Sequence, residues 1–137
     1  MKSNRTLARE VAMKILFARS LGGEETLEEV LEQSEAMDGL TNGDKTFLEN
    51  EVFGVEQHQQ ELDELISKYS KGWNIGRLGK VELILLRMAL YELVYLPEVP
   101  VGAAINEAVE LSKRFCEDKS YSFINGILGA AARELRA

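Results

Sequence analysis

The chain has 137 residues, of which 45% are hydrophobic and 28% charged, and it carries a net charge of −7. This length and apolar content are typical of one folded domain and exclude a disordered chain. The single cysteine excludes an internal disulfide and a metal site of several thiolates, and no uncharged run is long enough to span a membrane. The polar beginning of the chain lacks the apolar block of a signal peptide, so we expect a location in the reducing cytoplasm.

The charge is unevenly distributed along the chain. Residues 1–20 carry five Lys or Arg against one Glu, a net of +4, whereas residues 21–67 carry a net of −13 and residues 68–137 a net of +2. A bound anion senses the charges within roughly 8–10 Å, one Debye length at physiological salt, more than it senses the net charge. The basic beginning of the chain can therefore bind nucleic acid, although a solvated amphipathic helix with a chance excess of cations would show the same pattern.

The first elements are predicted from apolar residues three or four positions apart. A helix is expected from about residue 3 to residue 22, with Arg5 and Arg9 on the polar side, opposite its buried stripe. Residues 24–38 predict an acidic second helix, and residues 37–44 ("MDGLTNGD") are a run of turn formers.

The middle of the chain returns to helical periodicity. Residues 44–69 predict two helices or one bent helix, and "SKGWNIGR" (70–77) interrupts the pattern. Residues 78–95 are the most apolar segment, which predicts a central helix because only a helix surrounded by others is apolar on most faces. "PEVP" (97–100) ends this helix, since residues before proline avoid the α region.

Two further helices are predicted at about 101–115 and 120–136. With no strict alternation of apolar and polar residues anywhere, the sequence predicts an all-α fold of six or seven helices. We expect two small bundles packed together in a single domain, with an N-terminal subdomain at about 1–70 and a C-terminal subdomain at about 71–137.

No group of residues predicts catalysis. His58, the only histidine, has no partner at metal-ligand spacing and is expected to be a solvated helix residue, and Cys116 has no histidine nearby in the sequence. No glycine-rich phosphate loop is present. We therefore expect no enzymatic activity, no cofactor and no metal.

Three stretches of sequence carry a resemblance to a known family. They are "RTLAREVAMKILF" (5–17), "WNIGRLGKVELILLRMALYEL" (73–93), and "VPVGAAINEAVELSKRF" with "SFINGILGAAA" (99–115 and 122–132). In this order they resemble the NusB family of transcription antitermination factors, and the third stretch is the most specific. The resemblance implies an all-helical fold, pairing with the ribosomal small-subunit protein NusE, and binding of the single-stranded boxA element of nascent ribosomal RNA within the RNA polymerase antitermination complex.

The resemblance also implies RNA-binding residues at the beginning of the chain. Lys2, Arg5, Arg9 and Lys14 lie where the family carries an arginine-rich segment that contacts RNA. The planar guanidinium group suits this task because its donors match phosphate oxygens and its face stacks on bases.

A second RNA-binding region is expected between the last two predicted helices, where cations and aromatic residues alternate. Such interleaving is what single-stranded RNA requires, and the resemblance implies the same use. Phe123 is expected in the core, and Asn125-Gly126 are interpreted as structural, a buried amide beside a close helix contact. The candidate RNA-binding residues here are Lys113, Arg114, Phe115, Lys119 and Ser122, with Tyr121 as a further stacking face.

Phe17, Glu82 and Arg87 are the candidates for binding the protein partner. Phe17 could stack on a base, contact NusE or belong to the core. Glu82 and Arg87 interrupt the most apolar helix, so each must be paired or face outward. The resemblance implies a place on the surface that meets NusE or RNA, and an ion pair to another helix is the alternative.

The main alternative function is a protein-only adaptor or chaperone. Such a protein would hold a basic ribosomal protein on its acidic face, without specific RNA binding.

Overall fold

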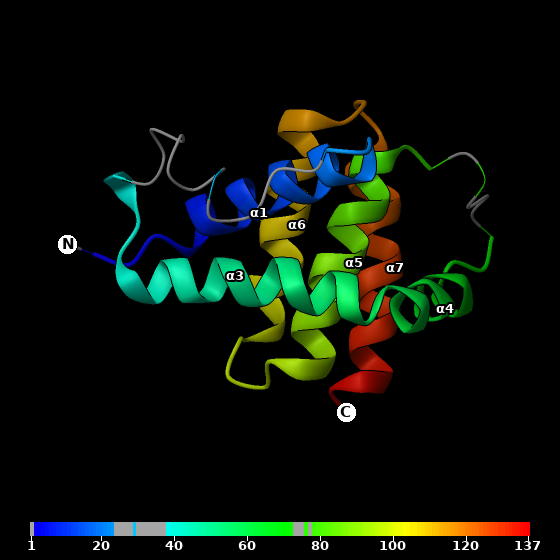
Figure 1. Cartoon of the computed structure of the whole chain (residues 1–137). Helices are drawn as coiled ribbons and strands as arrows, with labels where there is room; N and C mark the ends of the chain where they lie inside the picture. The colour runs from blue at the N-terminus through cyan, green and yellow to red at the C-terminus, as the bar shows by residue number, and fades with distance from the viewer. Residues whose placement is uncertain (1, 24–28, 30–37, 73–75, 77) are drawn as a thin grey trace. The chain divides into compact units, whose positions relative to one another are not determined.

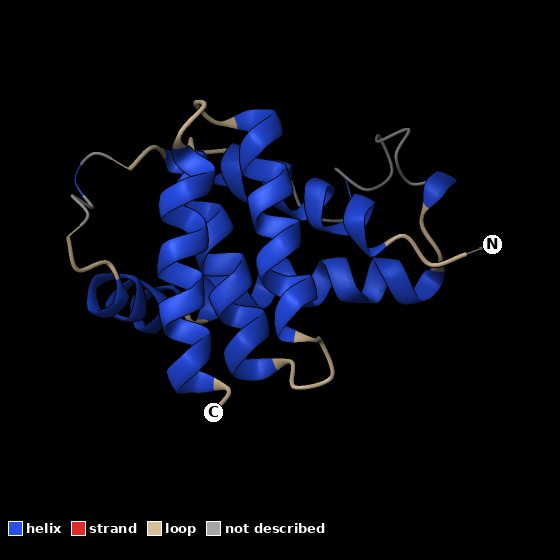
Figure 2. Cartoon of the chain, turned by 180° about the vertical axis from the view of Figure 1, so that it is seen from behind, coloured by secondary structure: helices blue, strands red, loops and turns tan. Residues whose placement is uncertain are grey.

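The computed structural model describes residues 2–23, 29, 38–72, 76 and 78–137 (Figure 1). The described part of the chain forms six helices and no strand, which confirms the all-α prediction (Figure 2). The acidic helix expected at 24–38 lies almost entirely outside the described residues. Most of the predicted interruption at 73–77 lies outside them as well.

The chain divides into two compact units, Met1–Gly54 and Val55–Ala137. The division falls within a helix, earlier than the boundary near residue 70 that the sequence pattern gave. The reason is that residues 59–69 form a helix that packs on the helices of the second unit.

The first unit contains α1 (Arg5–Ser20) and α3 (Asn42–Gln57) as far as Gly54. The Asn4 side chain starts α1 by accepting a hydrogen bond from the Leu7 amide at 3.0 Å. Thr41 and Asp44 start α3 as a capping box, since the Asp44 amide donates to Thr41 Oγ1 and the Thr41 amide donates to the Asp44 carboxylate. The buried apolar residues of α1 are Ala8, Val11, Ala12, Met13, Ile15 and Leu16.

The second unit contains α4 (Gln59–Tyr69), α5 (Lys80–Tyr95), α6 (Val101–Phe115) and α7 (Ser120–Leu135). α5 packs against α4, α6 and α7, as expected for the central helix, and α6 lies beside α7 (Figures 1 and 2). Residues 44–69, for which the sequence predicted either two helices or one bent helix, form two helices. The break between them is at His58.

The end of the chain closes the second unit. The Arg136 guanidinium donates to the carbonyl oxygens of Leu93, Leu96 and Val99 at 2.8–3.0 Å. These carbonyls belong to the end of α5 and to the turn after it, where helical hydrogen bonds run out. One side chain therefore binds backbone carbonyls at the end of α5 and in the turn after it, where Leu96 O also accepts from the Val99 amide.

Candidate nucleic-acid interface

The first residues of the chain are fixed to the beginning of α3 by one carboxylate. Asp44 accepts hydrogen bonds from Ser3 Oγ at 2.8 Å and from the Asn4 amide at 2.7 Å, and it forms an ion pair with Arg5. The Asp44 side chain is fully buried. Burial acts to raise the pKa of Asp44, but the hydrogen bonds from Asn4, Thr41 and Ser3 outweigh it and hold the pKa well below its ordinary value.

Arg5 and Arg9 both approach the ring of Phe47 on α3. Their guanidinium carbons lie 4.9 and 5.0 Å from its centroid, within cation–π range. Arg5 keeps 43% of its side chain exposed, whereas Arg9 is only 5% exposed. The prediction that Arg9 lies on the solvated polar side of α1 is therefore wrong, because Phe47 and its surroundings cover that position.

Lys2 and Lys14, two of the candidates that the family resemblance implied, are exposed. The ammonium of Lys14 lies 2.9 Å from the Glu10 carboxylate one turn earlier, yet 57% of its side chain stays accessible. The accessible cations in the N-terminal segment of the first unit are thus Lys2, Arg5 and Lys14. We call these three residues the N-terminal cationic surface. Asp44 and Phe47, which orient Arg5, were missed from the sequence, although Thr41-x-x-Asp44 carries the signature of a capping box.

The junction between α6 and α7 brings cations and aromatic rings together on the surface. Lys113 Nζ lies 5.3 Å from the Tyr121 ring centroid, and Arg114 lies 4.9 Å from the Phe115 ring centroid. Phe115 is 37% and Tyr121 43% exposed, a large exposure for apolar rings. Lys119 and Ser122 are exposed as well. The six residues named here form the α6–α7 junction surface, as predicted from the sequence.

Glu82, at the beginning of α5, is attached to this junction. Its Oε1 accepts a hydrogen bond from Ser120 Oγ at 2.9 Å, and Ser120 is buried. Burial and then the Glu82 carboxylate raise the pKa of the Cys116 thiol to about 12. A side chain at Gly79 would collide with the same carboxylate, so glycine leaves the space that Glu82 occupies. Glu82 therefore joins the start of α5 to both ends of the loop between α6 and α7.

Three comparisons with known proteins agree with one another. Residues 6–133 match the model of the NusB family. The transcription antitermination protein NusB of Geobacter sulfurreducens is 42% identical over 134 residues, covering 96% of this chain and 95% of that protein. The chain belongs to the NusB family.

Solved structures give the same result. NusB of T. maritima has a TM-score of 0.83 at 33% identity, covering 98% of this chain and 94% of that one. A chain from a crystal structure of the antitermination factors NusB and NusE in complex with double-stranded RNA has a TM-score of 0.79 at 29% identity, covering 94% and 96% of the two chains.

Arg87 of this NusB-family chain is paired within the second unit. Its Nε and Nη2 donate to the two oxygens of Asp63 on α4 at 2.7 and 3.0 Å, and only 13% of its side chain is exposed. Arg87 therefore forms an ion pair with another helix, which was the alternative that the sequence left open. Phe17, in the last turn of α1, is half-buried.

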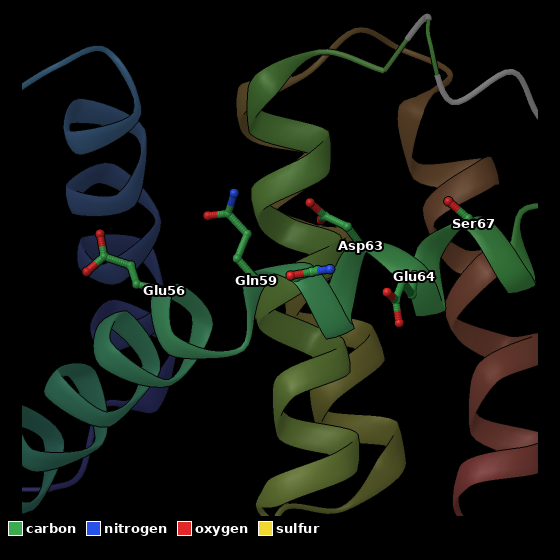
Figure 3. Close-up of a pocket in the computed structure, with 6 residues that line it drawn as sticks. Glu56, Gln59, Asp63, Glu64 and Ser67 are labelled. Carbon is green, nitrogen blue, oxygen red and sulfur yellow. The ribbon is translucent and has the colours of Figure 1, made fainter.

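An acidic hollow of about 590 Å³ lies on the surface of the second unit beside this ion pair (Figure 3). Its carboxylates would repel a phosphate and would attract a cationic group. Its lining residues are Glu56, Gln59, Gln60, Asp63, Glu64 and Ser67.

Three interpretations of single residues need correction. Asn125 and Gly126 are exposed on α7, so they are not the buried amide and close helix contact that the sequence suggested. Phe123 is half-buried instead of part of the core. His58 stacks on Tyr95, with 4.2 Å between the ring centroids, and is not a freely solvated helix residue.

Within the described residues, no cluster of His, Cys, Asp and Glu could hold a metal ion. None of the described helices has both the length and the apolar character needed to cross a membrane.

Proposed function

We propose that this protein acts as a transcription antitermination factor that binds boxA-like RNA together with NusE, as part of the RNA polymerase antitermination complex. It acts on nascent ribosomal RNA transcripts, which places it in the cytoplasm, and it does so by binding alone, without catalysis. The observation that carries the proposal is the α6–α7 junction surface, where Phe115 and Tyr121 are exposed beside Lys113 and Arg114.

The chemistry of this surface fits unpaired RNA. Bases stack on exposed aromatic rings, and neighbouring cations bind the phosphates between those bases. The N-terminal cationic surface supplies further phosphate contacts through Lys2, Arg5 and Lys14. Arg9 supports these contacts indirectly, because it lies beside the Phe47 ring that also orients Arg5.

NusE, as a ribosomal protein, is expected to be basic. We infer that it binds the second unit at the acidic hollow, with Arg87 holding Asp63 in place at its edge. Glu82 belongs to the same helix as Arg87, and Phe17 offers a half-buried aromatic edge in the first unit. Complementary charge would speed the encounter of the two proteins and select the partner.

A titration of labelled RNA tests the proposed function. Fluorescence anisotropy would compare a boxA RNA with a scrambled RNA of the same composition, each with and without NusE. The expected result is weak binding of boxA by the protein alone and tighter binding with NusE, with the scrambled RNA weaker in both cases.

The acidic hollow supports a second candidate, a protein-only adaptor for NusE. Such an adaptor would bind NusE in the same experiment but would show no preference for boxA over the scrambled RNA. That outcome would replace the proposed RNA-binding function.

A further inference from the structure

A second hollow, between α4 and α7, has the opposite charge from the acidic one. Its volume is about 370 Å³, and three cations face one carboxylate in its wall. A local excess of two positive charges stands out in a chain whose net charge is −7. The residues that line this α4–α7 hollow are Lys68, Tyr69, Lys71, Gly126, Ala130, Arg133 and Glu134.

The cations of the hollow come from both walls. Lys68 Nζ lies 3.0 Å from Glu134 Oε1, and more than half of each side chain is exposed, so a ligand can reach the ammonium. Lys71 also lies close enough to Glu134 to lower the pKa of that carboxyl, after the larger effect of Lys68. Lys68 and Arg133 each lie in the last turn of a helix, and attraction to the helix C-terminus explains each position separately. This attraction does not explain why cations from two helices surround one hollow.

Small residues on α7 keep the hollow open. Gly126 is exposed in the middle of the helix, although glycine is a poor helix former, and Ala130 follows one turn later. A Cβ atom at Gly129 would lie 3.8 Å from Nη1 of Arg133, so the guanidinium lies back along α7 toward these residues. A backbone without side chains allows close approach of a ligand.

The Tyr69 side chain also lies in the wall, beside Lys68 and Glu134. Its hydroxyl oxygen is buried and makes no hydrogen bond of good geometry with any described residue, but it lies near enough to Glu134 to help lower the pKa of that carboxyl. Because this oxygen is buried, an anion in the hollow would be bound by the cations of the wall.

The hollow is connected to the α6–α7 junction by one face of α7. Ser122, Gly126, Ala130 and Arg133 follow one another at intervals of three or four residues, which places them on the same side of the helix. The distance from Ser122 to Arg133 along the helix is roughly 16 Å, a span that a few nucleotides of extended RNA cover.

We propose that the α4–α7 hollow binds a backbone phosphate of the RNA strand that continues beyond the segment held at the α6–α7 junction. This inference rests on the proposed function. It adds a second anchoring point, in which Lys71 and Arg133 contact the phosphate. Lys68 shares its charge between Glu134 and the RNA.

The test compares a core boxA RNA with the same RNA extended by several nucleotides at either the 5′ or the 3′ end, all in the presence of NusE. We expect one of the two extended RNAs to bind roughly tenfold more tightly than the core, the gain from one or two charge-assisted hydrogen bonds. Its salt dependence should also be steeper, by about 0.7 for each added phosphate contact. The double variant Lys71→Gln, Arg133→Gln should remove both gains and leave the affinity for the core RNA unchanged.

Two matched controls separate the hollow from a general charge effect. Glu134→Gln removes the only carboxylate of the wall and should tighten the extended RNA further, which a loss of structure would not do. Lys80→Gln removes an exposed cation that is not in the wall, and the gain from extension should survive it. Thermal unfolding should be nearly unchanged in all variants, since these side chains are on the surface.

The outcomes separate this inference from the proposed function. Failure of the core RNA to bind would contradict the proposed function, and the inference would fall with it. Binding of the core RNA without any gain from either extension would overturn the inference alone. The inference would also be overturned if the extended RNA still bound more tightly than the core RNA to the double variant. Binding of inorganic phosphate in the hollow, without any gain in affinity from extension of the RNA, would overturn it as well.

Discussion

The Ser120 hydroxyl donates a hydrogen bond to the Glu82 carboxylate at 2.9 Å, which fixes the first residue of α7 to the first turn of α5. The RNA-binding surface that we propose lies immediately around Ser120, from Lys113 to Ser122. The position of its exposed rings thus depends on a carboxylate that the sequence suggested for partner binding. Glu82 can have this structural role whether or not NusE also contacts it.

The first prediction concerns the charge of Glu82. Because burial and then this carboxylate raise the pKa of Cys116 to about 12, Glu82→Gln should lower the thiol pKa toward, but not to, its ordinary value near 9. The pH dependence of the alkylation rate measures the pKa directly. Glu117→Gln is the control. Glu117 is exposed and follows Cys116 in the sequence, but it is not among the causes of the raised thiol pKa. An unchanged alkylation profile in Glu82→Gln would show that Glu82 does not lie against Cys116.

The second prediction concerns Asp44 and acid. The folded pKa of Asp44 lies below its unfolded value, so the carboxylate contributes stability at pH values above about 4, and this contribution is lost as the pH falls further. Asp44→Asn should lower the free energy of unfolding by about 1–3 kcal/mol at neutral pH, since buried donors lose their acceptor. Urea titrations at several pH values measure the difference, which should shrink below pH 4. If the difference in unfolding free energy between the two proteins stayed constant from pH 7 to pH 3, the lowered pKa of Asp44 would be contradicted.

The third prediction concerns the exposed rings. Phe115→Ala and Tyr121→Ala should each weaken boxA binding by about 1–3 kcal/mol, the cost of one lost stacking contact. Phe115→Tyr should retain the affinity, because the stacking face is kept. Anisotropy titrations measure both, with thermal unfolding to show that the fold is intact. If both alanine variants bound boxA as tightly as the original protein, stacking at the α6–α7 junction would be disproved.

The fourth prediction concerns the end of the chain. Arg136 donates to three backbone carbonyls at 2.8–3.0 Å, so Arg136→Met should lower the free energy of unfolding by about 1–3 kcal/mol. Arg136→Lys should recover only part of this, since an ammonium lacks the planar fork of a guanidinium. Arg133→Met is the matched control, since Arg133 is an exposed arginine in the last turn of α7, and it should have little effect on stability. Equal unfolding curves for the Arg136 and Arg133 variants would contradict the capping role.

The helices could be predicted from the sequence because local patterns determine them. Periodicity and the two prolines placed the ends of α5 and α6 within a residue or two, and the interleaved cations and rings pointed to the α6–α7 junction. Arg9 could not be placed, since the covering ring of Phe47 comes from another helix. A helical pattern shows which residues share a face. It does not show what a distant segment of the chain puts over that face.

The same limit applies to polar residues with two possible roles. Asn125-Gly126 has the composition of a buried helix contact, but α7 turns this face outward. Arg87 was assigned to the partner-binding surface, with an ion pair to another helix as the alternative, and identifying Asp63 as its partner required the packing of α4 on α5. The α4–α7 hollow depends on residues that lie far apart in sequence, and no local pattern marks it.

The most direct test of the proposed RNA-binding surfaces is the salt dependence of boxA affinity in the presence of NusE. Five or so phosphate contacts, from the N-terminal cationic surface and the α6–α7 junction surface, predict a slope of about −3 to −4 in a plot of log K against log salt concentration. The double variant Lys2→Gln, Arg5→Gln should make the slope shallower by about 1.4. A slope near zero, or a slope that the double variant leaves unchanged, would contradict RNA binding by these cations.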